Sequence, residues 1–340
     1  GLGRREDSMK ALVTGGGGFL GGAIVRALVS RGDSVRSFSR ASYGALTALG
    51  VEQVTGDLAD CAAVSAAARG CDIIFHVAAK PGVWGPYEDY YRANVLGTEN
   101  VLTACRAQEI GRLVYTSSPS VVFHGSDMEG VDETVPYPDH FEASYPQTKA
   151  IAEQQVLAAN GTSLATVALR PHLIWGPEDN HLVPRIIQRG RAGQLRRIGG
   201  RPCLVDHIYV DNAAEAHLQA ADHLAPNSAV AGKAYFISNG EPIPLWEMVN
   251  RILAAAGIPP VERTISPQLA YAAGAVLEKL YATFKLSGEP RMTRFLAREL
   301  STAHWFDISA ARRDFGYVPR VSTAEGLLRL QAWLQSHPQP

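Results

Sequence analysis

The chain has 340 residues, of which 46% are hydrophobic and 19% are charged. That length is enough for one large domain or two closely joined domains, with a core that needs no disulfide or metal to stabilise it. The 32 Lys and Arg nearly balance the 33 Asp and Glu, which leaves a net charge of −1. This balance argues against a general electrostatic attraction to nucleic acid or to an anionic membrane.

The four cysteines stand at positions 61, 71, 105 and 203, and no two of them form a C-x-x-C pair. Their spacing signals neither a zinc site nor a redox-active dithiol, so we expect no bound metal. Scattered thiols in a chain of this size suit a reducing compartment, and the expected location is the cytoplasm. No apolar run reaches the roughly 18–20 residues that a membrane span needs.

Residues 1–8 are polar and charged, and they lack the apolar middle of a signal peptide. We therefore expect a disordered extension at 1–8, with Met9 as a candidate native start.

From residue 10 to residue 169 the pattern alternates between short apolar runs and segments with helical spacing. The predicted strands are 10–14, 34–38, 51–55, 72–77, 113–117 and 164–169, and the predicted helices are 19–31, 45–49, 62–69, 90–106 and 145–159. Such alternation predicts an α/β fold of the Rossmann type, with a doubly wound parallel sheet.

After residue 170 prolines interrupt the chain more often. Helices are predicted at 183–191, 211–223 and 245–255, strands at 203–210 and 234–237, and mostly helix from there to 334. We predict a nucleotide-binding domain over 9–170 with later returns near 203–237. Residues 171–202 and 238–335 are then a smaller, mostly helical cap that binds the substrate.

A glycine-rich turn follows the first predicted strand and opens the first predicted helix. Glycines at 15, 18 and 21 fit G-x-x-G-x-x-G, and those at 16, 18 and 21 fit G-x-G-x-x-G. Glycine permits the tight turn and lets backbone N–H groups approach a pyrophosphate, which the helix N-terminus stabilises. In this strand–turn–helix context the motif predicts dinucleotide binding.

The end of the second predicted strand bears on the choice of dinucleotide. An acid at this place holds the ribose hydroxyls of NAD, but here the sequence reads Ser39-Arg40. A guanidinium suits a 2′-phosphate, so NADP(H) is favoured over NAD(H). The alternative is that Arg40 is a solvated surface charge.

Tyr145 and Lys149 stand four residues apart, on one face of a predicted helix. The ammonium and a cationic nicotinamide ring favour the phenolate, so we expect the pKa of Tyr145 to fall toward neutrality. Such a tyrosine gives a proton to a ketone oxygen or takes one from an alcohol. Ser118, at the end of the preceding strand, can hydrogen-bond the same oxygen; Ser117 and Ser120 remain alternatives.

With these residues in place, the chain resembles the extended short-chain dehydrogenases/reductases, in particular their 3β-hydroxysteroid dehydrogenase branch. The similarity covers about residues 9–335. It rests on TGGGGFLG (14–21), GDL (56–58), HVAAK (76–80), NVLGTENV (94–101), YTSSPSVV (115–122), YPQTK (145–149), LRPHLIWGP (169–177), YVDNAAEAH (209–217) and FGYVP (315–319).

The resemblance implies that Tyr145 is the acid/base, Lys149 its activator and a ribose ligand, and Ser118 the carbonyl-binding hydroxyl. The cofactor-binding residues that it implies, together with the glycine turn and the end of the second strand, are Gly15, Gly18, Phe19, Leu20, Gly21, Ser39, Arg40, Asp57, Leu58, Ala78, Ala79, Lys80, Pro171, Leu173 and Ile174. The candidate substrate contacts are Trp84, Ser120 and His172.

Other polar residues have simpler interpretations. We expect His76, within a buried strand, to be a hydrogen-bonded core histidine, and Asn94 to be structural, with a proton relay as its alternative. Asp206, His207 and Asp211 lie around a strand-to-helix junction, where structural hydrogen bonds and helix capping are favoured over metal ligation.

The segment AAKPGVWGPYEDYY (78–91) is most similar to that of bacterial 2-alkyl-3-oxoalkanoate reductases of long-chain olefin and β-lactone biosynthesis. The implied reaction is the reversible reduction of a 2-alkyl-3-oxo acid to the 3-hydroxy acid. The alternatives are a sterol-4α-carboxylate 3-dehydrogenase, a nucleotide-sugar epimerase or dehydratase, and a cofactor-sensing protein without activity.

A long apolar substrate needs an apolar channel. Residues 267–286 form an apolar segment that suits either a lipid-facing or substrate-covering amphipathic helix, or a cap helix packed on the core. Lys80 and Arg170 are candidate partners for a substrate carboxylate.

The expected partners are the substrate, enzymes of the same pathway, a membrane surface contacted peripherally, and a second copy of the chain. By resemblance, a dimer would form through helices near 90–106 and 145–159. Their apolar side chains, such as Val95 and Leu102, suit packing within the monomer equally well.

Overall fold

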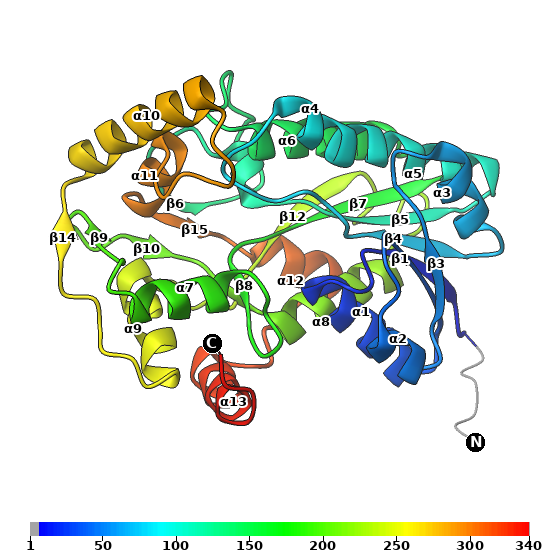
Figure 1. Ribbon diagram of the computed structural model, residues 1–340. Helices are drawn as coiled ribbons and strands as arrows, with labels where there is room; N and C mark the ends of the chain where they lie inside the picture. Colours follow the sequence, from blue (N-terminus) through cyan, green and yellow to red (C-terminus); the bar gives the residue numbers. More distant parts are fainter. Residues whose placement is uncertain (1–6, 340) are drawn as a thin grey trace.

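The computed structural model describes residues 7–339, so most of the predicted extension at 1–8 lies outside the described residues (Figure 1). At its centre is a seven-stranded sheet whose neighbouring strands are all parallel. In spatial order the strands are β12 (Lys233–Ile237), β7 (Ala165–Pro171), β5 (Arg112–Thr116), β4 (Ile73–His76), β1 (Lys10–Thr14), β2 (Ser34–Ser39) and β3 (Glu52–Thr55). The predicted doubly wound sheet is confirmed.

Helices cover both faces of this sheet (Figure 1). One face carries α3 (Cys61–Ala68), α4 (Tyr87–Tyr90), α5 (Gly97–Ala107) and α6 (Ser144–Ala158). The other carries α1 (Phe19–Ser30), α2 (Gly44–Ala48), α8 (Val210–Asp222) and α12 (Ser309–Phe315), and α13 (Thr323–Ser336) lies farther out against α9 (Leu245–Ala255). The order of the strands reverses between β1 and β4, which in such folds creates a crevice for ligands at their carboxyl ends.

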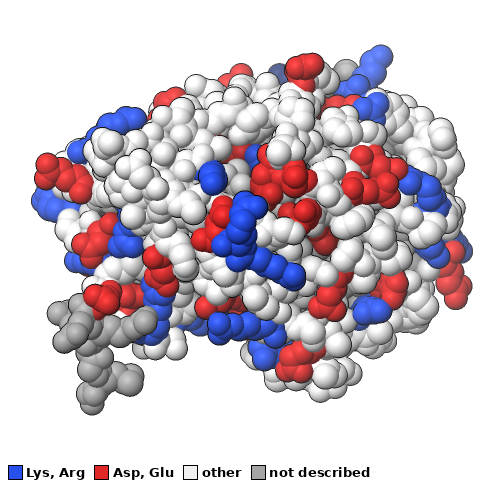
Figure 2. All heavy atoms as spheres, turned by 180° about the vertical axis from the view of Figure 1, so that it is seen from behind, with Lys and Arg blue, Asp and Glu red and all other residues white. Residues whose placement is uncertain are grey.

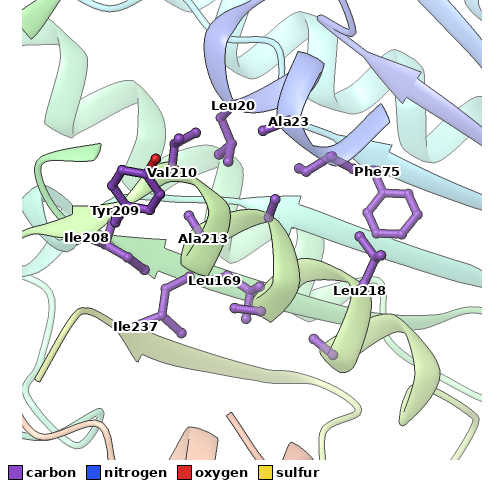
Figure 3. Packing of buried hydrophobic residues seen from close by; sticks show 14 of the residues in the cluster. Leu20, Ala23, Phe75, Leu169, Ile208, Tyr209, Val210, Ala213, Leu218 and Ile237 are labelled. Carbon is purple, nitrogen blue, oxygen red and sulfur yellow. The ribbon is translucent and has the colours of Figure 1, made fainter. Parts of the chain in front are cut away.

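Alternate residues of each strand enter two separate cores. Ala11 and Val13 of β1 belong to the cluster beneath α1 and α8, whereas Leu12 belongs to the cluster beneath α3 and α5. Figure 3 shows the first cluster, in which side chains of α8 interdigitate with the sheet. Since both faces are covered, β4 reads as the continuous apolar run that the sequence predicted.

The long helix predicted at 90–106 contains a π-helical turn, η1 (Tyr91–Leu96), between α4 and α5. Asn94 lies in this turn. Its amide donates to Thr148 Oγ1 of α6 at 3.1 Å, and its Oδ1 accepts from the backbone N–H of Lys80 at 2.8 Å. The wider turn therefore joins α6 to the loop after β4, and the structural interpretation of Asn94 is confirmed. Val95 is fully buried within the chain.

The cap combines α7 (Leu182–Arg191), α9, α10 (Pro267–Phe284) and α11 (Arg294–Leu300) with short strands. The sheet nearest the main sheet contains β13 (Ile243–Pro244), β10 (Leu204–Val205), β15 (His304–Phe306) and β6 (Met128–Val131). Two separate strand pairs complete the cap. Strand β8 (Ile174–Trp175) pairs with β11 (Ile208–Tyr209), and β9 (Arg197–Ile198) pairs with β14 (Thr264–Ile265).

The single strand predicted at 203–210 is wrong, because β10 and β11 belong to different sheets. The chain turns away between them at Asp206, whose N–H donates to the carbonyl of His304 at 2.7 Å and whose carboxylate accepts from the N–H of Phe306 at 2.8 Å. Of the later segments, β12 alone returns to the seven-stranded sheet in the described residues.

The surface carries both signs of charge. On the face shown in Figure 2, acidic and basic side chains are interspersed, and neither sign covers a broad area. Within residues 7–339 no helix combines the length and the hydropathy that crossing a bilayer requires.

Helix α6 is fastened to the sheet by a buried ion pair. Arg170, near the end of β7, donates to both oxygens of Glu153 at 2.5 and 3.0 Å, and the two side chains are 4% and 0% exposed. Ser117 Oγ and Tyr137 OH donate to the same carboxylate, each at 2.5 Å. Burial alone would raise the pKa of Glu153, but these donors hold it below its ordinary value. The expectation that Arg170 binds a substrate carboxylate is wrong, because its charge is already paired.

Replacing Glu153 with Gln should lower the free energy of unfolding by about 3–5 kcal/mol, because it leaves the Arg170 guanidinium buried without a counter-ion. Urea denaturation at neutral pH measures this. The native pKa of Glu153 is depressed, so its contribution is present above the unfolded pKa of about 4 and is lost as the pH falls below it. The two proteins should therefore converge in acid.

Glu325→Gln is the matched control. Glu325 pairs with Arg329 one turn away on exposed α13, so its loss should change stability by less than about 0.5 kcal/mol. Equal effects of the two substitutions would contradict the role given to Glu153.

Candidate active site

The glycine turn connects β1 to α1 with close backbone contacts. Gly15 has φ +72° and donates to the carbonyl of Phe38, and Gly18 donates back to the carbonyl of Gly15, both at 2.9 Å. A Cβ on Gly21 would lie 2.0 Å from the Gly15 oxygen, so a larger residue at position 21 would force the turn open. Gly18 is the N-cap of α1 and provides no side-chain cap. The first N–H groups of α1, those of Phe19 and Leu20 among them, can thus receive an anion.

The loop after β4 lies against this turn. Thr14 Oγ1 accepts from the N–H groups of Val77 and Ala78 at 3.0 and 3.1 Å, and a Cβ on Gly15 would lie 3.1 Å from Ala78. Residues 78–80 therefore cross the carboxyl edge of the sheet beside the glycines. His76 is the last residue of β4. Its ring hydrogen-bonds Thr14 Oγ1 at 2.7 Å and Thr98 Oγ1 at 3.0 Å, which confirms it as a hydrogen-bonded core residue.

The carboxyl end of β2 supplies a polar group without a protein partner. Ser39 Oγ is buried and has no hydrogen bond within the described residues, and exposed Arg40 follows it. A buried hydroxyl beside a free guanidinium fits an anionic ligand group. In the loop after the neighbouring strand β3, the Asp57 carboxylate pairs with Arg92 at 3.6 Å, and the Leu58 side chain lies against Gly97 of α5. The residues present thus fit a dinucleotide from the pyrophosphate turn to the adenosine end.

Tyr145 and Ser118 meet where α6 begins. Tyr145 lies in the first turn of α6, and Ser118, the N-cap of the 3₁₀ turn η2 (Pro119–Val122), lies close enough to its phenol to act on the pKa of that group. Ser118 Oγ is also 2.9 Å from Ser120 Oγ. Ser117 is turned to Glu153 instead. Among the three serines left open by the sequence, Ser118 and Ser120 are thus the pair beside Tyr145.

The pKa of Tyr145 does not follow the prediction. Its burial, together with the negative charge of Glu299, outweighs the hydrogen bond from Ser118 and raises the pKa of the phenol to about 12. Lys149 does not offset this, because its amine donates to the carbonyl of Thr116 at 2.7 Å and lies 4.4 Å from the centre of the Tyr115 ring. Burial lowers the pKa of Lys149 to about 7, against the attraction of Glu153. The expected fall toward neutrality is wrong for the protein's own groups.

The segment that follows β7 borders the same edge. Strand β7 ends at Pro171, Leu173 has φ +49°, and Ile174 pairs with Ile208. The His172 ring lies 5.8 Å from the ring of His304 and makes no hydrogen bond among residues 7–339. Burial lowers the pKa of His172 to about 3, so the ring is neutral at physiological pH.

Two cap residues complete the site and were not anticipated from the sequence. His304 Nε2 hydrogen-bonds the carbonyl of Glu299 at 2.9 Å and Thr302 Oγ1 at 2.8 Å. The Glu299 carboxyl group has no hydrogen bond or ion pair within the described residues, and burial raises its pKa to about 7. A glutamate far along the chain carries no local pattern that links it to Tyr145.

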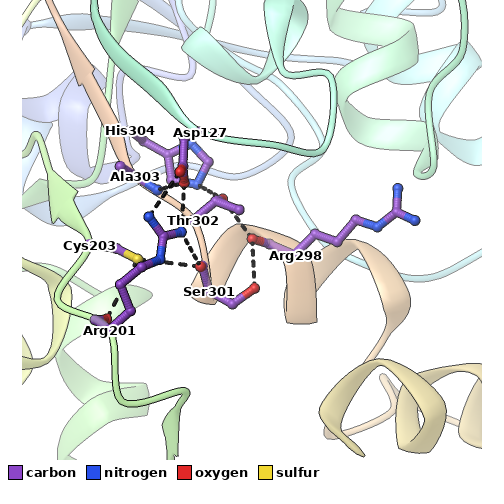
Figure 4. Close-up of polar contacts among 8 residues, drawn as sticks. All are labelled: Asp127, Arg201, Cys203, Arg298, Ser301, Thr302, Ala303 and His304. Atoms are coloured by element: carbon purple, nitrogen blue, oxygen red, sulfur yellow. Dashed lines mark hydrogen bonds and ion pairs between the residues drawn. The ribbon is translucent and has the colours of Figure 1, made fainter. Parts of the chain in front are cut away.

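Polar contacts hold this part of the cap in place (Figure 4). Asp127 accepts from the N–H of Ala303 at 2.9 Å and from both terminal nitrogens of Arg201, also at 2.9 Å. Arg298 of α11 forms an ion pair with Glu142, which precedes α6. The cap is therefore joined to the start of the helix that carries Tyr145.

Two further expected residues lie nearer the rim. The carbonyl of Trp84 accepts from Tyr90 OH at 2.6 Å, and its ring meets that of Tyr281 of α10 edge-on at 6.4 Å. Lys80 Nζ lies 5.1 Å from the centre of the Tyr90 ring. No group of three His, Cys, Asp or Glu side chains in residues 7–339 is arranged to hold a metal ion.

Comparisons with known proteins agree with this architecture. The sequence profile of the "3-beta hydroxysteroid dehydrogenase/isomerase family" matches residues 12–268. A 2-alkyl-3-oxoalkanoate reductase of Stenotrophomonas maltophilia (strain K279a) is 58% identical over 95% of this chain and 99% of its own, and one of Shewanella oneidensis is 52% identical over 95% and 86%. The crystal structure of a Thermus thermophilus UDP-glucose 4-epimerase in complex with NAD superposes with a TM-score of 0.74 at 25% identity, covering 97% of this chain and 100% of that one. The chain belongs to the 3-beta hydroxysteroid dehydrogenase/isomerase family of oxidoreductases.

Proposed function

We propose that the protein reduces the 3-oxo group of a 2-alkyl-3-oxoalkanoic acid to the 3-hydroxy acid, reversibly, with NADPH. The observation that carries the reaction type is that Tyr145, in the first turn of α6, and Ser118, at the N-cap of η2, lie together at the sheet edge that also bears the glycine turn. Support for the substrate class comes from the two reductases of that name, which match nearly the whole chain.

The chain's own groups divide the proton chemistry between them. Tyr145 holds its proton, because burial raises its pKa to about 12, and it donates that proton to the ketone oxygen during reduction. The hydroxyl of Ser118 hydrogen-bonds the same oxygen and stabilises the charge that develops on it. Lys149, whose amine donates to the carbonyl of Thr116, would hold the ribose of the bound cofactor. The bound nicotinamide supplies the hydride.

Tyr145→Phe should lower kcat by about 10²–10⁴-fold, because the proton donor is lost while the ring remains. A free 3-oxo acid loses CO₂ readily, so the assay follows NADPH formation from a 2-alkyl-3-hydroxy acid. Binding of NADPH, measured by fluorescence, should be unchanged.

Tyr91→Phe, at a half-exposed position on η1, should leave kcat unchanged. A Tyr145→Phe protein with full activity would overturn the mechanism. Turnover of a 3β-hydroxysterol-4α-carboxylate or of a UDP-sugar, without turnover of the hydroxy acid, would overturn the substrate class.

The preference for NADP(H) is part of the proposal and rests on Ser39 and Arg40. In the oxidation of the hydroxy acid, Arg40→Ala should raise the KM for NADP+ about tenfold or more, since a charge-assisted hydrogen bond to the 2′-phosphate is lost, and should leave the KM for NAD+ unchanged. Steady-state kinetics with both cofactors measure this. Equal effects on the two would mean that Arg40 does not contact the phosphate.

Glu299 should shape the pH dependence. Its carboxylate raises the pKa of Tyr145, and alcohol oxidation requires the phenolate. Glu299→Gln removes that charge, so the acidic limb of log(kcat/KM) for oxidation should move to lower pH, by about 0.5–1 unit. An unchanged profile would mean that the carboxyl group does not act on Tyr145, and Glu325→Gln on α13 serves as a control outside the site.

A further inference from the structure

Helix α10 exposes a row of large apolar side chains to solvent. Leu269, Val276 and Phe284 are 59%, 59% and 67% exposed, and Leu280 and Leu286 are exposed as well. The spacing of 7, 4 and 4 residues from 269 to 284 places four of them along one side of the helix. Of the eleven large apolar side chains that are exposed in residues 7–339, five lie in this segment. We call these five residues the α10 row.

The opposite side of α10 is fixed to the rest of the cap. A Cβ on Gly274 would lie 2.5 Å from the backbone of Thr293, so α10 and α11 are in backbone contact. Glu278 accepts from the Arg294 side chain at 2.9 Å. Figure 1 shows α10 along the outer edge of the molecule, with α11 beneath it. Because the buried side is packed this closely, the α10 row is held outward in a single orientation.

The charges around the α10 row are mainly positive. Glu278 is 14% exposed and paired, while Lys279 and Lys285 are exposed and carry no ion pair in the described residues. Of the five Lys and Arg from 267 to 298, Arg294 and Arg298 pair with Glu278 and Glu142, which leaves Lys279, Lys285 and Arg291 without an ion pair in the described residues. An apolar helix face flanked by cations is typical of a helix that lies in the interface of an anionic bilayer.

The row also lies beside the loop after β4, which carries the candidate substrate contact Trp84. Tyr281 of α10 contacts the Trp84 ring, and Glu289, beyond the end of α10, accepts from the N–H of Val83 at 3.2 Å. A molecule leaving the bilayer at the α10 row would therefore meet the loop that carries Trp84.

We propose that the α10 row is a peripheral membrane-docking surface, which inserts shallowly into an anionic lipid leaflet and turns the loop at Trp84 toward it. The docking itself stands on exposure and charge; the further statement that lipid-borne substrate enters there rests on the proposed function. Broad attraction to membranes was not expected from the net charge, and this contact is local to one helix.

Flotation with vesicles tests the docking without substrate or cofactor. The purified full chain is mixed with vesicles of phosphatidylcholine alone or with about one third phosphatidylglycerol. The wild type should float with the anionic vesicles, less so at high salt. The double variant Val276→Glu/Phe284→Glu should reduce the bound fraction at least about tenfold, since it places two carboxylates in the interface.

Leu328→Glu is the matched control, because Leu328 is 62% exposed on α13, away from α10. It should float like the wild type, and all three proteins should oxidise a short-chain, water-soluble hydroxy acid at equal rates, which shows that they are folded. Absence of wild-type flotation, or equal flotation of the double variant, would overturn the proposal. So would light scattering that finds a wild-type oligomer dissociated by the double variant, because the α10 row would then be a subunit interface. Docking without turnover would contradict only the proposed function.

Discussion

The arrangement at the sheet edge depends on one buried ion pair, Glu153 with Arg170. It links the middle of α6 to the end of β7, and through Ser117 and Tyr137 it also fixes the loop after β5 and the segment before α6. Two charges in so dry a place are tolerated because the Glu153 carboxylate accepts four hydrogen bonds, two of them from Arg170, although the Nη1 of Arg170 has no partner within the described residues. Since Glu153 lies one turn beyond Lys149, its position determines where that amine and the start of α6 meet the strands.

That constraint also explains why Tyr145 and Lys149 differ from the simple expectation for a tyrosine–lysine pair. The spacing of four residues does place both on one helix, but the amine is drawn to the carbonyl of Thr116 and the Tyr115 ring. The same burial that depresses the pKa of the lysine raises that of the tyrosine. The protein thus presents a protonated phenol, the form needed to reduce a ketone, and a positive nicotinamide is the missing influence that would favour the phenolate for the reverse direction.

Local patterns predicted the nucleotide-binding half well. Apolar runs and helical spacing predicted its strands and helices. Even α9 in the cap has the predicted bounds, 245–255. What failed depends on distant partners: the break at Asp206 follows from its bonds to His304 and Phe306, and the pairing of Arg170 follows from Glu153. Charged residues carry no mark of whether they will face a ligand or one another, so composition and spacing leave both open.

The cap adds a titratable carboxyl group, that of Glu299, which the Tyr–Ser–Lys arrangement alone would lack. Contacts from Asp127 and Glu142 hold α11 and the turn after it against the site, and this brings the unpaired carboxyl group of Glu299 near Tyr145. A proposed acid substrate that placed its carboxylate beside Glu299 would be repelled by the ionised form and would bind better when Glu299 is protonated. By linkage, such binding would raise the pKa of Glu299 further and take up a proton near neutral pH.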